Sequence, residues 1–250
     1  AATVIMDLTV EAEAFGAEII FPENEVPSVS GRLLADEAAI EKLDIPAIDY
    51  TKGVRVENPD GVQAKEFILP KELLEAECVI SLSKMKTHAL ERITGAVKNS
   101  YGFVYGKNKA IGHTKYPSAD SFARMLIDLN QYVKPRLYIM DGITAMEGNG
   151  PGSGDPVAMN LILMSTDPVA LDSVFARLVY LKPEMVPTNY HGEKMGLGNC
   201  REENIEVVVV EENPSASAVC DEGSEITGRA KQCQNAKVSV DKKQIGIDVV

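Results

Sequence analysis

The sequence predicts an α/β fold, with a mostly parallel sheet, helices on both faces and one attached antiparallel hairpin. Short apolar runs of strand length alternate with amphipathic runs of helix length along most of the chain. One pair of alternating runs surrounds Asp60-Gly61, a dipeptide typical of hairpin turns. The 250 residues are 45% hydrophobic and 25% charged, an ordinary globular composition with enough apolar residues for a substantial core.

The N-terminal part predicts two units in which a helix precedes a strand. Segment 3–21 reads as an amphipathic helix, a stop at Gly16 and a strand, and segment 36–50 repeats that order. Residues 54–70 then predict the antiparallel hairpin.

The central part predicts a buried strand followed by the basic stretch and a long helix. After a helix over 70–77, the continuous apolar run 78–83 is typical of a parallel strand covered on both faces. Cys78 is therefore expected to be buried. Residues 118–133 carry apolar side chains at helical spacing, with Ser118 as the helix cap.

The remaining elements continue the alternation. Strands are expected over 136–140 and 160–165, and a helix over 166–181. A last strand is expected over 205–210. The polar composition that follows divides the chain into an α/β domain, 1–212, and a polar appendage or the start of a truncated second domain, 213–250.

Charge and hydropathy exclude some classes of protein. The net charge of −12 argues against general nucleic-acid binding, which needs a broad basic face. No apolar run approaches the roughly 20 residues that cross a bilayer, so a soluble, cytoplasmic protein without a membrane partner is expected. The four cysteines, Cys78, Cys200, Cys220 and Cys233, lack the spacing of a cluster or zinc site and fit a reducing compartment.

One stretch has the opposite charge balance to the whole chain. Between residues 84 and 115, Glu91 is the single acid, and the local balance is +6. The basic residues of this stretch are Lys84, Lys86, Arg92, Lys98, Lys107, Lys109 and Lys115. Such a local positive site attracts anions, although a solvated basic loop is the alternative.

Three loops are expected at the carboxyl edge of the sheet, where α/β proteins bind ligands. The first follows 78–83, with Lys84, Lys86 and His88 in the loop and a helix beginning near Thr94-Gly95. That helix carries Lys98 and Asn99, and its backbone N–H groups are further anion donors. The sequence favours a bound phosphate or carboxylate here, with His88 transferring a proton and Lys86 stabilising negative charge as catalytic candidates.

The second loop follows the strand over 136–140. Asp141 stands at the expected strand end and Glu147 lies six residues further on. Four alternating glycines follow, Gly148, Gly150, Gly152 and Gly154, and Gly142 precedes them. A loop in which Asp141, Gly142, Glu147, Gly148, Gly150 and Gly154 contact the ligand and a plain mobile turn are both consistent with this pattern.

The third loop contains Thr166, Asp167 and Asp172. Helix capping explains Asp167 without any function.

Histidines raise the possibility of a metal site. The three histidines, His88, His113 and His191, are each expected in a loop or at the end of an element. A divalent metal bound by His88, His113 and Asp141 is one hypothesis, and ordinary polar surface is the alternative.

The motifs together resemble a known family. KMKTHALERITGAVKNSYG, GHTKY, IDLNQYVKPRLYIMDGITAMEGNGPGSGDP and STDPVALDSVFARL, within about residues 65–198, are similar to the domain of unknown function 362 family. The resemblance implies these signature positions: Lys84, Lys86, His88, Thr94, Lys98, Asn99, His113, Asp141, Gly142, Glu147, Gly148, Gly150, Pro151, Gly154, Asp167 and Asp172. It also implies an association with iron–sulfur proteins, because many members join this domain to ferredoxin-like cysteine clusters. Such a cluster is expected outside this sequence or on a partner.

Three functions therefore stay open. The preferred one is a domain, an enzyme or a sensor, that binds a small anionic molecule in the strand-end cleft. The second is a redox module that positions an iron–sulfur cluster or binds a ferredoxin-like partner. The third is a non-catalytic interaction domain whose basic stretch binds an acidic protein.

Overall fold

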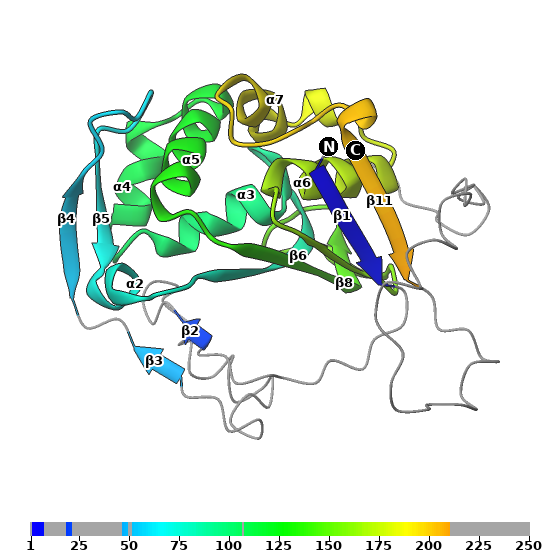
Figure 1. Cartoon of the computed structure of the whole chain (residues 1–250), viewed down its shortest axis with the longest axis horizontal. Coiled ribbons are helices and arrows are strands. Elements are labelled where there is room, and N and C mark those ends of the chain that lie inside the picture. Colours follow the sequence, from blue (N-terminus) through cyan, green and yellow to red (C-terminus); the bar gives the residue numbers. More distant parts are fainter. Residues whose placement is uncertain (1, 8–18, 22–46, 50–51, 107, 211–250) are drawn as a thin grey trace, which may run out of the picture.

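A computed structural model describes residues 2–7, 19–21, 47–49, 52–106 and 108–210 of the chain. Its centre is a mixed seven-stranded sheet in the order β11-β1-β10-β8-β6-β7, with β9 paired to β8 (Figure 1). The strands of this sheet are β1 (Ala2–Asp7), β6 (Ile80–His88), β7 (Arg92–Thr94), β8 (Leu137–Glu147), β9 (Asp155–Ala158), β10 (Ile162–Ser165) and β11 (Ile205–Val210).

The α/β class is confirmed, but the sheet is mixed rather than mostly parallel. β1 runs parallel to β11 and β6 parallel to β8, whereas β10 is antiparallel to both of its neighbours. The first half of β8 pairs with β10 and the second half with β9, both antiparallel. The cause lies in the connections, because a parallel neighbour requires a crossover of a dozen or more residues and none separates β8, β9 and β10.

Helices cover one face of this sheet. The described helices are α2 (Lys71–Glu75), α3 (Ala96–Asn99), α4 (Asn108–Lys115), α5 (Ala119–Val133), α6 (Pro168–Leu178) and α7 (Pro187–Lys194), of which α2 contacts β5 instead. Short 3-10 turns add η2 (Ser100–Phe103), η3 (Pro183–Met185) and η4 (Glu202–Asn204). Figure 1 shows α3, α5, α6 and α7 gathered on the same side of the β6 and β8 strands.

Residues alternate between a buried and an open face along β6. Met85 is buried in one cluster with Tyr138 and Met140 of β8 and Leu171 of α6. On the opposite face, Ile80 and Leu82 are 46% and 54% exposed. Helices were predicted on both faces, and among the described residues they cover one face only. The helix expected over 36–43 lies outside the part of the chain that the structure describes.

Two small sheets complete the described part. The expected hairpin is present as β4 (Gly53–Glu57) and β5 (Glu66–Pro70), paired antiparallel. Asp128 of α5 anchors it, accepting hydrogen bonds from the backbone N–H groups of Val62, Gln63 and Ala64 at 2.6–2.8 Å. Strands were expected at β2 (Ile19–Phe21) and β3 (Ala47–Asp49), and the structure pairs them in parallel.

Several local predictions were wrong. Residues 2–7 form strand β1 where a helix was expected, because their backbone pairs with β10 on one side and β11 on the other. Cys78 is exposed, since it precedes β6 instead of lying within it. Lys84, Lys86 and His88 lie on β6 itself and not in a loop after it.

The expected α5 and α6 helices are confirmed, including their caps. Ser118 accepts from the backbone N–H of Ser121 at 3.1 Å, and Asp167 accepts from those of Val169 and Ala170, both at 2.9 Å. Across the part of the chain that the structure describes, no helix is long and apolar enough to span a membrane. Segment 213–250, the predicted appendage, lies outside the described residues.

Candidate functional site

The site is organised by the hairpin that joins β6 to β7. His88 and Arg92 are register partners at its end, and Glu91 lies in the turn between them. The turn is closed by a hydrogen bond from the backbone N–H of Ile93 to the carbonyl oxygen of Glu91, at 2.8 Å. Arg92 has a φ of 67°, a left-handed conformation that is uncommon outside glycine. This tight turn brings an imidazole, a carboxyl and a guanidinium group onto three neighbouring positions.

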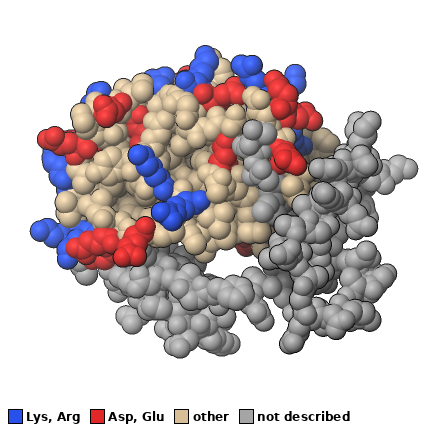
Figure 2. All heavy atoms as spheres, viewed as in Figure 1, with Lys and Arg blue, Asp and Glu red and all other residues tan. Residues whose placement is uncertain are grey.

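Five basic side chains near this turn influence one another's charge. We call them the Lys98 cluster: Lys86, His88, Lys98, Lys109 and His113. Burial lowers the pKa of Lys98, and the charges of Lys86 and Lys109 lower it further while Glu91 opposes them. Burial, with Lys98 nearby, also lowers the pKa of His113. On the face shown in Figure 2, acidic and basic side chains are interspersed.

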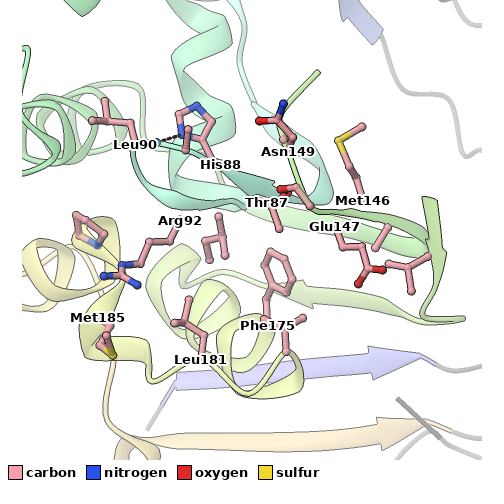
Figure 3. Close-up of a pocket in the computed structure, with 18 of the residues that line it drawn as sticks. Thr87, His88, Leu90, Arg92, Met146, Glu147, Asn149, Phe175, Leu181 and Met185 are labelled. Atoms are coloured by element: carbon pink, nitrogen blue, oxygen red, sulfur yellow. Dashed lines mark hydrogen bonds between the residues drawn. The ribbon is translucent and has the colours of Figure 1, made fainter. Parts of the chain in front are cut away.

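Hydrogen bonds fix the tautomer of His88. Its Nδ1 accepts from the backbone N–H groups of Leu90 and Glu91, both at 3.1 Å, and Figure 3 shows the first of these contacts. Burial, assisted by the charge of Lys98 and by His113, lowers the pKa of His88 to about 4. His88 is therefore expected to be neutral at pH 7 with its proton on Nε2, which makes Nε2 a hydrogen-bond donor.

Glu91 is the residue that sequence reasoning missed. Its side chain is fully buried, and neither carboxyl oxygen has a hydrogen-bond partner. Burial raises the pKa of Glu91 to about 8, although Lys98 opposes the shift. Its place as the single acid within a basic stretch was a visible signal, but the sequence does not show that the side chain is buried. Burial of a carboxyl group against a lysine is instead typical of functional sites.

A pocket of about 470 Å³ opens beside this turn. Its floor is apolar and includes Phe175 and Leu181, and Figure 3 shows Arg92 and Glu147 on opposite sides of Phe175. Thr87, His88 and Asn149 add polar groups to the wall. This size and lining are typical of sites for small molecules.

The glycine-rich segment is the turn of the β8–β9 hairpin and packs on the end of β6. Thr87 donates a hydrogen bond from Oγ1 to the carbonyl oxygen of Gly148, at 2.9 Å. A Cβ atom at Gly150 would lie 2.2 Å from the carbonyl oxygen of Thr87, so this close approach requires glycine. Gly148 and Gly150 line the pocket, whereas Gly154 packs against the carbonyl oxygen of Glu147. The first two predicted loops therefore do come together.

Other predicted site residues have structural partners. Lys84 forms an ion pair with Asp141, at 2.5 Å, within the two paired strands. Asn99 donates to the carbonyl oxygen of Leu82 at 2.7 Å, which fixes α3 beside β6. Gly142 is buried within β8, where a Cβ atom would lie 2.5 Å from the sulfur of Met85. Thr94 ends β7, and its buried hydroxyl has no hydrogen-bond partner.

The third predicted loop lies elsewhere. Because β10 is antiparallel to β8, Asp167 follows the strand end that pairs with the beginning of β8, away from His88. Asp172 accepts from the backbone N–H groups of Ala96 and Val97, at 2.6 and 3.1 Å. The start of α3, expected to hold an external anion, thus already binds the carboxyl group of Asp172.

The predicted metal ligands do not form one group. His113 stacks on Phe122 with ring centroids 4.6 Å apart, and Asp141 is engaged by Lys84. His191 contacts Asp120 at 2.7 Å. Among the described residues, no group of three or more His, Cys, Asp or Glu side chains is placed to hold a metal ion. Cys220 and Cys233 lie outside the described residues.

Fold and site together define an α/β protein with a partly buried cluster of basic side chains next to an amphipathic pocket. A family model described as domain of unknown function (DUF362) matches residues 24–177, and the chain belongs to this family. The chain is also 38% identical over 159 residues to the thylakoid-associated protein sll1697 of Synechocystis. That match covers 63% of this chain and 49% of the relative, so the chain spans about half the relative's length. No solved structure matches the chain.

Proposed function

We propose that the end of β6 binds a small anion, a phosphate or carboxylate group, between Lys86 and Lys98. The crowding of Lys98 by Lys86 and Lys109 supports this most directly. Among the described residues, no carboxylate lies within ion-pair distance of Lys86 or Lys98. A bound anion relieves the repulsion between these ammonium groups, and partial burial strengthens its attraction to them.

His88 then has the role of a neutral donor. Its Nε2 carries the ring hydrogen, because Nδ1 accepts from two backbone N–H groups, and this hydrogen is the one it donates to the anion. If the site is catalytic, His88 and Lys86 stabilise negative charge that develops on the substrate. Glu91, fully buried and with a raised pKa, is the group in this site suited to exchanging a proton near neutral pH.

Binding of inorganic phosphate, followed by calorimetry at low ionic strength, tests the proposal. Lys98→Met and Lys86→Ala should each weaken phosphate binding about tenfold, because each removes one of the charges that hold the anion. Lys182→Ala, at an exposed position outside the Lys98 cluster, is the matched control and should bind as the original protein does. The proposal fails if phosphate and acetate do not bind, or if Lys182→Ala weakens binding equally.

A further inference from the structure

The pocket beside the β6–β7 hairpin has an apolar floor built by distant parts of the chain. Ile93 of β7, Val157 of β9 and Phe175 of α6 line it together with Leu181. Met159 and Met185 add flexible side chains that adapt to a ligand's shape. This lining favours the apolar body of a molecule and offers it few hydrogen bonds.

Two opposite charges stand on the walls above that floor. Arg92 is exposed, and within the described residues no carboxylate pairs with its guanidinium group. Glu147 is half-buried, and its Oε2 is buried without a hydrogen-bond partner. In the view of Figure 3 they lie on opposite sides of Phe175, and no ion pair joins Arg92 to Glu147.

A buried carboxyl oxygen without a hydrogen-bond partner destabilises the folded state unless a donor reaches it. An ionised carboxylate only accepts hydrogen bonds, so Glu147 needs a donor, and an ammonium or hydroxyl group of a ligand supplies one. A guanidinium group instead matches the two oxygens of a carboxylate. Arg92 lines the pocket and has a left-handed backbone conformation. Residues with such uncommon backbone conformations occur often at binding sites.

We propose that this pocket binds an amphiphilic amino acid, in which an apolar chain separates a carboxylate held by Arg92 from an ammonium group held by Glu147. The proposal goes beyond the phosphate or carboxylate site, because Arg92 and Glu147 lie outside the Lys98 cluster. A simple fatty acid would leave Glu147 without a donor, and a simple amine would leave Arg92 without an anion. The two charges together therefore specify a ligand with both groups.

Calorimetric titration with 6-aminohexanoate and 8-aminooctanoate, compared with octanoate and octylamine, tests this ligand class. At least one amino acid should bind about tenfold more tightly than either singly charged compound. Arg92→Met should remove the advantage of the amino acid over octylamine, and Glu147→Gln its advantage over octanoate. Arg136→Met, an exposed arginine outside the pocket, is the matched control and should change neither.

Three results would overturn the proposal: no binding of either amino acid, equal binding of all four compounds, or preferences that the two pocket variants leave unchanged. Circular dichroism and the melting temperature of each variant establish that it is folded before binding is interpreted. Phosphate binding by Arg92→Met separates the amino acid proposal from the anion site at the end of β6. If this variant loses the amino acid preference and still binds phosphate, the change concerns the pocket alone.

Discussion

His88 and Glu91 show how burial, rather than residue type, sets charge at this site. They lie three residues apart, and the Glu91 backbone N–H donates to the His88 ring. Burial makes the charged form of each side chain costly, so it lowers the pKa of the histidine and raises that of the glutamate. Lys98 reinforces the shift at His88 and opposes it at Glu91. The two groups are thus both biased towards their neutral forms, beside a cluster of lysines.

The first prediction concerns the protonation of His88. The ring should stay neutral, with its proton on Nε2, until the pH approaches about 4. Between about pH 4 and 6.5, His88 binds fewer protons in the folded state than in the unfolded state. Its contribution to the free energy of unfolding is therefore complete above pH 6.5 and declines as the pH falls towards 4. Nitrogen NMR of the imidazole rings, assigned with His113→Gln and His191→Asn variants, measures the tautomer and the pKa of His88. A ring titrating near its ordinary pKa would contradict the prediction.

The second prediction concerns Glu91. Its raised pKa means that the folded state holds a proton that the unfolded state releases between about pH 4.5 and 8, so stability falls as the pH rises through that range. Glu91→Gln removes this titration and should make the protein about 1–3 kcal/mol more stable at pH 8. Urea unfolding at pH 5 and pH 8 measures the difference. The exposed Glu203→Gln is the control, and an equal pH dependence in both variants would show that Glu91 is not the cause.

At the scale of elements, α3 depends on a contact distant in the sequence. This four-residue helix cannot be stable by itself, yet it carries Lys98. Asp172 of α6 binds its first two N–H groups, and a Cβ atom at Gly95 would lie 2.1 Å from the nearer Asp172 oxygen. Glycine is therefore required for this close contact, which connects α6 to the position of Lys98.

The third prediction follows from this contact. Asp172→Ala leaves two buried N–H groups without acceptors and should destabilise the protein by about 2–4 kcal/mol. Phosphate binding should weaken as well, because α3 positions Lys98. Asp172→Asn keeps one acceptor oxygen and should lose less than Asp172→Ala. Urea unfolding and calorimetry measure the two effects, and the exposed Asp155→Ala provides the baseline. Unchanged stability in Asp172→Ala would reject this role.

The elements that sequence reasoning predicted correctly are those with strong local signals. The α5 helix has regular apolar spacing and a Ser118 cap, and the β4–β5 hairpin has its turn residues. Strand direction was not predictable in the same way, because it depends on which strands pair in the folded protein. β10 is antiparallel to its neighbour β8. The position of Lys86 and His88 next to the glycine-rich turn was foreseen, whereas the burial of Glu91 depends on tertiary packing that no local pattern reveals.

At the scale of the whole molecule, the sheet joins segments from distant parts of the chain. β1 lies between β10 and β11, so it is held by strands that follow it by more than 150 residues. All six residues of β11 pair with β1, and Ile205 and Val209 pack against the core cluster that contains Met85 and Leu171. The described domain is therefore complete only when β11 is present.

The last prediction compares two shortened chains. A chain ending at residue 212 retains β11 and should melt within about 2 °C of the full chain, as the predicted domain boundary implies. A chain ending at residue 204 loses the strand that pairs with β1 and the apolar contacts of Ile205 and Val209. It should lose about 3–5 kcal/mol of stability, or unfold outright, and expose the edge of β1 to aggregation. Calorimetric melting and light scattering measure both chains. Equal melting of the two would show that β11 is dispensable, and a large loss in the longer one would place residues beyond 212 within the cooperative domain.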